Sequence, residues 1–193
     1  MADVSSRRWQ PYVMFGLIVF SAAINVLLIL KVRSEQRVIS SLKTQNRLHD
    51  GQNVPNIIGK NPQGEIAEVN FSTSSKPTIL YVFSPACGWC KRNFENMTVL
   101  RRSVRDKYEF IGISLTDKGL SDYIKMNKVD YPVITELPET TKTIYRLGGT
   151  PATIVVSPTN KVLKAWTGAY NGPLEAEISN YFNVKLPGLL ARN

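Results

Sequence analysis

The chain has 193 residues, 43% of them hydrophobic, enough for one ordinary domain with a sizeable core and an appendage. Its formal net charge of +9 suggests nucleic-acid binding, but the basic residues are scattered and no helix-turn-helix, finger or RNA-binding signature accompanies them. We therefore expect no nucleic-acid partner. The densest basic group indicates a solvated helix face or, alternatively, a contact with anionic lipid or an acidic partner; it comprises Arg101, Arg102, Arg105 and Lys107.

A membrane-spanning segment is predicted near the start of the chain. A short polar N-terminus at 1–10 precedes the segment 11–31, which carries no charge before Lys31. About 20 apolar residues suffice to cross about 30 Å of hydrocarbon. Trp9 and Tyr12 lie at one end, as interfacial aromatic residues do. We expect a single transmembrane helix at 11–31 that contacts the lipid bilayer, because the apolar run of a cleaved signal peptide is usually only about 7–15 residues.

The orientation of this helix is open to two arguments. More basic residues follow the span than precede it, so the positive-inside rule places the later domain in the cytoplasm. Long domains, however, are translocated largely regardless of charge.

The rest of the chain divides into a stalk, one domain and a tail. Residues 32–50 are polar with apolar positions at partly heptad spacing, which favours a solvated helical stalk over a short coiled-coil contact. The globular domain is expected at 51–187 and the tail at 188–193. Patterning predicts strands at 54–58, 66–71, 78–83, 109–115, 131–135, 152–156 and 162–166, and helices at 91–108, 119–128, 140–147 and 174–182.

The segment Cys87-Gly88-Trp89-Cys90 contains the only two cysteines and lies between the strand at 78–83 and the helix that follows it. Cys87 therefore falls near the N-cap, where unpaired N–H groups and a partial positive charge favour the nucleophilic thiolate. Cys90, one turn later, is placed to attack the mixed disulfide that Cys87 would form. The spacing predicts a redox pair, with Cys87 as nucleophile and Cys90 as resolving cysteine.

Two other interpretations of the pair are weaker. A zinc site needs about four ligands, and beyond these cysteines the chain has only one histidine, His49, far upstream. A purely structural disulfide is possible in an exported protein, but a bridge that closes so short a loop restricts the unfolded chain little. We therefore expect no metal and no cofactor beyond a Cys87–Cys90 disulfide.

A second motif, Gly148-Gly149-Thr150-Pro151, precedes the strand at 152–156. With the C-x-x-C, it resembles the thioredoxin superfamily, in which a Thr-Pro or Val-Pro downstream of the cysteines opens a strand. The resemblance implies that Pro151 is cis, packs opposite the cysteines and binds substrate together with Thr150. The alternative is an ordinary trans proline at the start of an edge strand. Gly149 is expected to permit unusual backbone angles and a close approach to the cysteine helix.

The resemblance also implies the fold class. This is α/β: a thioredoxin fold, with a central mixed β-sheet flanked by helices, an N-terminal hairpin, one inserted helix and strand around 119–135, and a single transmembrane helix before it. The pattern is most similar to membrane-anchored TlpA/ResA-type thiol–disulfide oxidoreductases, over about 51–185, and Gly168 matches a glycine they often carry. Because such relatives commonly face the periplasm, we expect the C-terminal domain to be exported.

Four residues depart from the superfamily pattern. Ala86 stands where a tryptophan usually precedes the first cysteine. Tyr81 stands where thioredoxin carries a buried aspartate, and Asn93 stands where some reductases of the subgroup keep an acidic residue. The proton acceptor for Cys90 is therefore not identified by sequence. Trp89 replaces the common proline between the cysteines and is expected to line an apolar substrate groove, with Gly88 and Tyr81 in supporting positions.

The resulting hypothesis is a membrane-tethered thiol–disulfide oxidoreductase that exchanges disulfides with exported proteins. A reductase is favoured, with apocytochrome c as one substrate that the resemblance implies and a membrane electron-relay partner. The alternatives are a disulfide-forming oxidase, a peroxide reductase, against which the C-x-x-C argues, and a non-catalytic binding module with an inert disulfide.

Overall fold

The computed structural model describes residues 10–45 and 48–189, and the chain divides into two units between residues 47 and 48. Three parts of the predictions lie outside the described residues: the polar N-terminus apart from Gln10, residues 46–47 of the stalk, and residues 190–193 of the tail.

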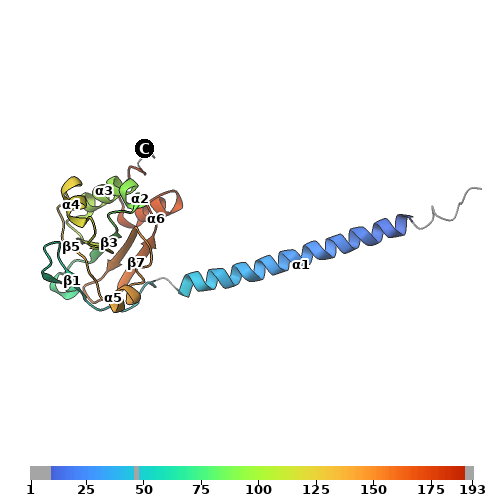
Figure 1. The fold of residues 1–193 in the computed structure, drawn as a ribbon, viewed down its shortest axis with the longest axis horizontal. Helices are drawn as coiled ribbons and strands as arrows, with labels where there is room; N and C mark the ends of the chain where they lie inside the picture. The colour runs from blue at the N-terminus through green and yellow to red at the C-terminus, as the bar shows by residue number, and fades with distance from the viewer. Residues whose placement is uncertain (1–9, 46–47, 190–193) are drawn as a thin grey trace, which may run out of the picture. The chain divides into compact units, whose positions relative to one another are not determined.

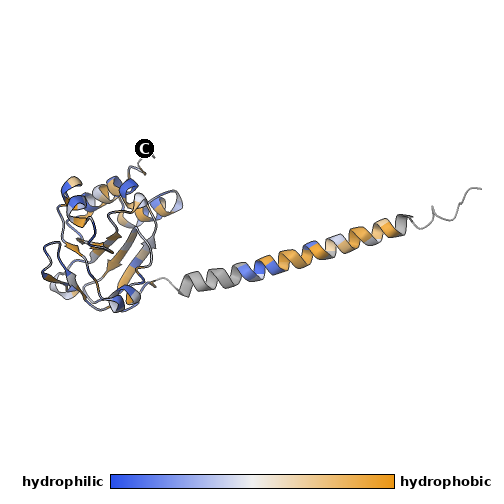
Figure 2. Cartoon of the chain, viewed as in Figure 1, coloured by the Kyte–Doolittle hydropathy of each residue, from blue (hydrophilic) through white to orange (hydrophobic). Residues whose placement is uncertain are grey.

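The first unit is one helix, α1 (Gln10–Gln45), which runs through both the predicted span and most of the predicted stalk. The segment Val13–Glu35 is long and apolar enough to cross a membrane. Its large apolar side chains, from Val13 to Val32, are exposed within the unit. Figure 2 shows this apolar stretch giving way to polar residues along the helix. An exposed apolar surface on all sides is what a lipid-facing helix requires.

The second unit is built on a five-stranded sheet in the order β5-β4-β3-β6-β7. The central strand β3 pairs in parallel with β4 and antiparallel with β6. The sheet is therefore mixed, as the resemblance implied. The strands are β3 (Thr78–Phe83), β4 (Glu109–Ser114), β5 (Val133–Ile134), β6 (Ala152–Val156) and β7 (Val162–Thr167).

A hairpin of β1 (Ile57–Lys60) and β2 (Ile66–Val69) precedes this sheet, followed by the 3-10 turn η2 (Phe71–Thr73). The side chain of Asn61 closes the connecting turn by accepting from the backbone N–H groups of Gln63 and Glu65. Lys60 exchanges two backbone hydrogen bonds of 2.8 Å with Thr135, which fixes the hairpin beside β5.

All six side chains of β3 are buried, because both faces of the sheet are covered. Ile79, Tyr81 and Phe83 share one core with residues of α3 (Phe94–Val104) and α6 (Pro173–Phe182). Leu80 and Val82 share the other core with the hairpin and with Leu137 and Tyr145, which lie just before and just after α5 (Glu139–Ile144). Figure 1 shows α3 and α6 on one side of the sheet and α5 on the other.

Several predicted elements were wrong in extent. The strand expected at 54–58 shares only residues 57–58 with β1, and the helix expected at 140–147 ends at Ile144. The single helix expected at 91–108 is two helices, α2 (Gly88–Arg92) and α3, because Asn93 interrupts them with φ −85° and ψ −2°. The strand expected at 131–135 contributes only the two residues of β5. The inserted helix is α4 (Leu120–Met126), close to its predicted position.

Candidate active site

The cysteine pair lies where β3 ends and α2 begins. The Cys87 N–H donates to the Ser84 carbonyl at 3.0 Å, which closes the turn between the two elements. Cys87 is the N-cap of α2, with extended φ and ψ, and its Sγ accepts from the Cys90 N–H at 3.1 Å. A sulfur thus takes the place of the usual capping oxygen and satisfies one of the unpaired N–H groups of the helix start.

The two thiols differ in access to solvent. Cys87 is partly exposed, whereas Cys90 is 0% exposed and belongs to the core shared with Tyr81 and Phe83. Burial, and next the hydrogen bond with the Cys87 side chain, raise the pKa of the Cys90 thiol from 9.0 to about 12. Because the thiolate is the reactive form, Cys87 is the thiol that can attack an incoming disulfide.

The Thr150–Pro151 loop lies opposite the cysteines. The Thr150–Pro151 bond is cis, and the Cys87 thiol donates to the Thr150 carbonyl at 3.6 Å. Pro151 is buried, and its carbonyl accepts from the Gly168 N–H at 2.8 Å. Gly168 has φ +121°, a backbone conformation that favours glycine. The structure therefore brings Cys87, Thr150 and Pro151 together, residues more than sixty positions apart in sequence.

The reason given above for the glycines of this loop was wrong. Neither Gly148 nor Gly149 has a positive φ. A Cβ at Gly148 would meet no atom within 4 Å, and one at Gly149 would only reach Thr167 Cγ2 at 3.6 Å. Gly88 likewise has open space where a Cβ would stand. These glycines leave room in front of the cysteines, and the backbone geometry does not require them.

Behind the cysteines, a network of uncharged polar groups crosses the core. Asn93, which is 0% exposed, donates to Tyr81 Oη at 3.5 Å and accepts from the Tyr170 N–H at 2.9 Å. Asn96 donates to the Tyr170 carbonyl at 3.3 Å and to Asn93 Oδ1 at 3.2 Å. The Tyr170 hydroxyl and Thr153 Oγ1 are 2.7 Å apart.

Sequence reasoning missed Asn96 and Tyr170. The available signal was the pair of asparagines three positions apart on a predicted helix, at a spacing that places them on one face. The network also explains the interruption between α2 and α3, because Asn93 caps one helix and starts the next while its side chain turns into the core.

Tyr81 lies at one end of this network, where its hydroxyl accepts from Asn93. Burial is the main cause that raises the pKa of the Tyr81 hydroxyl well above 10. Negative charge on Tyr170 or Cys90 would raise this pKa further, so the phenol is neutral at physiological pH. Its ring stacks on Phe83, with centroids 6.0 Å apart. Tyr123, in the same core, likewise has a pKa raised mainly by burial. The groups behind Cys90 thus provide hydrogen bonds and apolar contact without a carboxylate.

At the front of the site, Trp89 is 48% exposed, and the guanidinium carbon of Arg92 lies 4.7 Å from the centre of its ring. Among the described residues, no group of three or more His, Cys, Asp and Glu side chains is placed to hold a metal ion.

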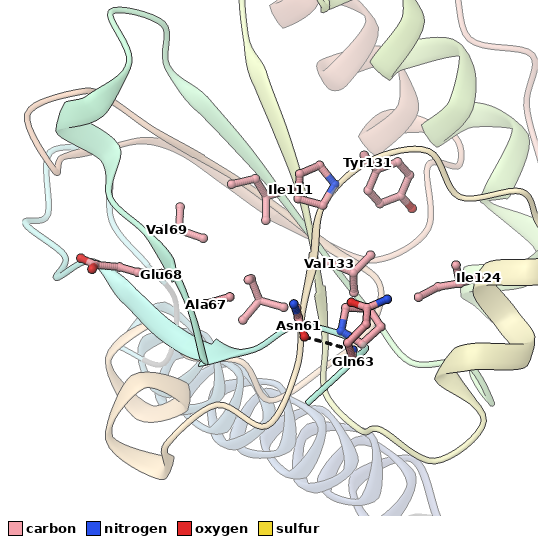
Figure 3. A pocket seen from close by; sticks show the side chains of 12 residues that line it. Asn61, Gln63, Ala67, Glu68, Val69, Ile111, Ile124, Tyr131 and Val133 are labelled. Atoms are coloured by element: carbon pink, nitrogen blue, oxygen red, sulfur yellow. Dashed lines mark hydrogen bonds between the residues drawn. The ribbon is translucent and has the colours of Figure 1, made fainter. Parts of the chain in front are cut away.

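A cavity of about 490 Å³ lies between the hairpin, β4, β5 and α4. Figure 3 shows Ala67 and Val69 facing Ile111 and Val133 across it. Its lining includes neither cysteine nor Pro151, so it is separate from the site described above.

The structure has a mixed sheet of this order, a C-x-x-C that begins a helix after the central strand, and a cis-proline opposite it, which together are the thioredoxin fold. No protein-family model matches the chain. In sequence it is similar to the thiol-disulfide oxidoreductase ResA of Bacillus subtilis, with 22% identity over 73% of this chain and 78% of that protein.

Solved structures support the same fold. The thioredoxin domain of a thiol-disulfide oxidoreductase from Bacteroides vulgatus has a TM-score of 0.57 at 19% identity, covering 70% of this chain and 99% of its own. The thiol:disulfide interchange protein DsbE from Chlorobium tepidum has a TM-score of 0.59 at 16% identity, covering 70% and 96%. StoA from Bacillus subtilis has a TM-score of 0.52 at 18% identity, covering 66% and 98%. The chain has the thioredoxin fold, and its similarity to these proteins supports a thiol–disulfide oxidoreductase of the ResA, DsbE and StoA type.

Proposed function

We propose that this protein is a membrane-tethered thiol–disulfide reductase of exported polypeptides. The observation that carries the proposal is the arrangement of Cys87: it is partly exposed, caps α2 through its sulfur, and lies 3.6 Å from the carbonyl of the cis-proline loop. Disulfide exchange requires three parts: an exposed nucleophile, a buried partner thiol and a backbone segment beside them.

The reaction proceeds in two exchanges. The Cys87 thiolate attacks one sulfur of a substrate disulfide, forms a mixed disulfide and releases the first substrate thiolate, which takes up a proton. Cys90 then loses its proton and attacks Cys87 Sγ, which forms the Cys87–Cys90 disulfide and releases the second substrate thiolate. The substrate gains two electrons and the protein loses two. A dithiol partner that carries electrons through the membrane would restore the reduced pair.

The reducing direction is supported by the uncharged surroundings of Cys90. Strong oxidants of this chemistry are strong because their reduced form is stabilised, often by charge next to a thiolate. Here the core behind Cys90 contains the neutral phenol of Tyr81 and the amide of Asn93. The raised pKa of Cys90 keeps this thiol protonated in the reduced protein.

The substrate is proposed to dock along the backbone of Thr150 and against Trp89. Pro151 has no N–H, so the backbone of Thr150, whose carbonyl lies 3.6 Å from Cys87 Sγ, is the part able to pair with an extended peptide. Unfolded exported proteins fit this mode, and apocytochrome c is one such substrate suggested by the family likeness. Residues 11–31 would tether the domain to the bilayer, with the domain on the exported side.

Mixed-disulfide trapping tests the exchange function. Cys90→Ser should accumulate covalent complexes with substrate polypeptides that reductant dissolves, because the intermediate can no longer be resolved. Cys87→Ser should form none. Trapping by both variants, or by neither in cells that express the protein stably, would contradict the assigned roles.

A reporter active only outside the cytoplasm, fused to the C-terminus, tests export. An active reporter is expected. A silent reporter on a stable fusion would place the domain in the cytoplasm, as the positive-inside rule suggests.

A further inference from the structure

The front of the site carries an aromatic–cationic pair that the exchange chemistry does not use. Trp89 exposes 48% of its surface beside the nucleophile, whereas Trp166, the other tryptophan of the domain, is 6% exposed. The guanidinium carbon of Arg92 lies 4.7 Å above the Trp89 ring. An exposed indole beside the nucleophile costs solvation free energy, which contact with a partner would recover.

A guanidinium group can lie beside an aromatic ring and still bind a carboxylate. It carries five N–H donors, and two of them match a carboxylate in a bidentate arrangement. Five donors are enough to hold a ligand carboxylate alongside other partners. The ring also fixes the orientation of a side chain that would otherwise lose conformational freedom on binding.

The strand order brings several segments with charged residues to the edge of the sheet that carries Cys87. The carboxyl ends of β3, β4 and β7 and the amino end of β6 lie at one edge of the sheet. The segments there are 84–96, 115–119, 146–151 and 167–172, and their basic side chains outnumber their acidic ones. The basic residues are Lys91, Arg92, Lys118 and Arg146, and the acidic ones are Glu95 and Asp117.

Two glycines of these segments have open space beside them. A Cβ at Gly88 or at Gly148 would meet no atom within 4 Å. A chain that brings its cysteine to Cys87 and pairs with the Thr150 backbone can therefore place a neighbouring residue beside Trp89. The charge that this neighbour would meet is that of Arg92.

We propose that Trp89 and Arg92 form a specificity element that selects polypeptide partners with an aspartate or glutamate next to the reactive cysteine. The proposal rests on the proposed exchange function and adds to it the chemistry of the partner. Arg92 binds the carboxylate, and Trp89 packs against the adjoining backbone and holds Arg92 in place.

The test uses three short cyclic disulfide peptides that differ only in the residue next to one cysteine: Asp, Asn or Lys. The reduced full-length protein in neutral detergent reduces each peptide, and chromatography follows peptide thiol formation. Each rate is divided by the rate with dithiothreitol, which removes differences in intrinsic reactivity. At low salt the wild type should prefer Asp over Lys by about threefold to tenfold, the range of an exposed to partly buried ion pair.

Three variants distinguish the proposal from a general charge effect. Arg92→Gln should lower the Asp-to-Lys ratio towards one, and Arg92→Lys should retain part of it, because charge remains without the bidentate fork. Arg102→Gln removes the same charge from an exposed position on α3 and should keep the wild-type ratio.

An unchanged ratio in Arg92→Gln, or an equal fall in Arg92→Gln and Arg102→Gln, would overturn the proposal. Reduction of all three peptides at equal rates by the wild type would overturn it while leaving the exchange function standing. If no peptide is reduced, the exchange function itself fails, and the specificity proposal with it.

Discussion

The two thiols of this site lie one helical turn apart but in opposite surroundings. Cys87 caps α2 at the surface, with a backbone N–H on one side and the Thr150 carbonyl on the other. Cys90 is completely buried in the core that also contains Tyr81, whose hydroxyl accepts from the buried amide of Asn93. The comparison shows how one short helix gives two chemically identical side chains different access to solvent, and burial raises the pKa of one of them. This difference supports the proposal that Cys87 attacks the substrate disulfide and Cys90 resolves the mixed disulfide.

The largest expected effect is on thiol reactivity. At pH 7, iodoacetamide should modify Cys87 at least about a thousandfold faster than Cys90, because a pKa of about 12 leaves very little Cys90 thiolate and burial restricts access. In Cys87→Ser, the Cys90 rate should rise roughly tenfold per pH unit from pH 8 upward, since the thiolate fraction does. Mass spectrometry of quenched samples measures both rates. Similar rates for the two cysteines between pH 5 and 9 would remove the distinction.

A smaller effect, on the free energy of unfolding, is expected when Asn93 is removed from the uncharged network. Asn93→Leu should lower the free energy of unfolding by about 2–4 kcal/mol, because it leaves the Tyr170 N–H and a donor of Asn96 without their acceptor. Denaturant unfolding of the reduced protein measures the change. Asn127→Leu is the matched control: it breaks one bond to the Tyr123 carbonyl at the end of α4 and should cost less than about 1 kcal/mol. Equal losses would show that the network has no special role.

The smallest effect is expected from the hydroxyl of Tyr81. Tyr81→Phe removes a partner that Asn93 reaches only at 3.5 Å, so the free energy of unfolding should change by less than about 1 kcal/mol. The pH dependence of Cys90 alkylation should hardly move, because burial is the main cause of its raised pKa. A shift of that profile by one pH unit or more would instead make Tyr81 a direct partner of the Cys90 thiol.

The sequence predicted the parts of the molecule that local pattern determines. The apolar run at 78–83 is β3 residue for residue, and the C-x-x-C after it predicted the N-cap position of Cys87. Strand β6 was also predicted with its observed bounds, because a proline and an apolar run mark its start. These elements can be predicted without any knowledge of distant residues.

The remaining features depend on contacts between distant residues. The interruption at Asn93 could not be predicted, since its side chain is satisfied by Tyr170, seventy-seven positions later. β5 is short because only two of its residues pair with β4, and its neighbour Thr135 pairs with the hairpin instead. The open space at Gly88 and Gly148 likewise follows from tertiary packing, which local sequence propensity does not describe.

The reduction potential of the Cys87–Cys90 pair tests the proposed reductase most directly. The full-length protein is equilibrated with glutathione buffers of defined ratio, quenched by acid and alkylated, and the oxidised fraction is read by mass spectrometry. A surface thiol backed by an uncharged core predicts a potential near about −270 mV, in the range of thioredoxin-like reductants. A value near about −120 mV, typical of strong disulfide-forming oxidants, would contradict the account.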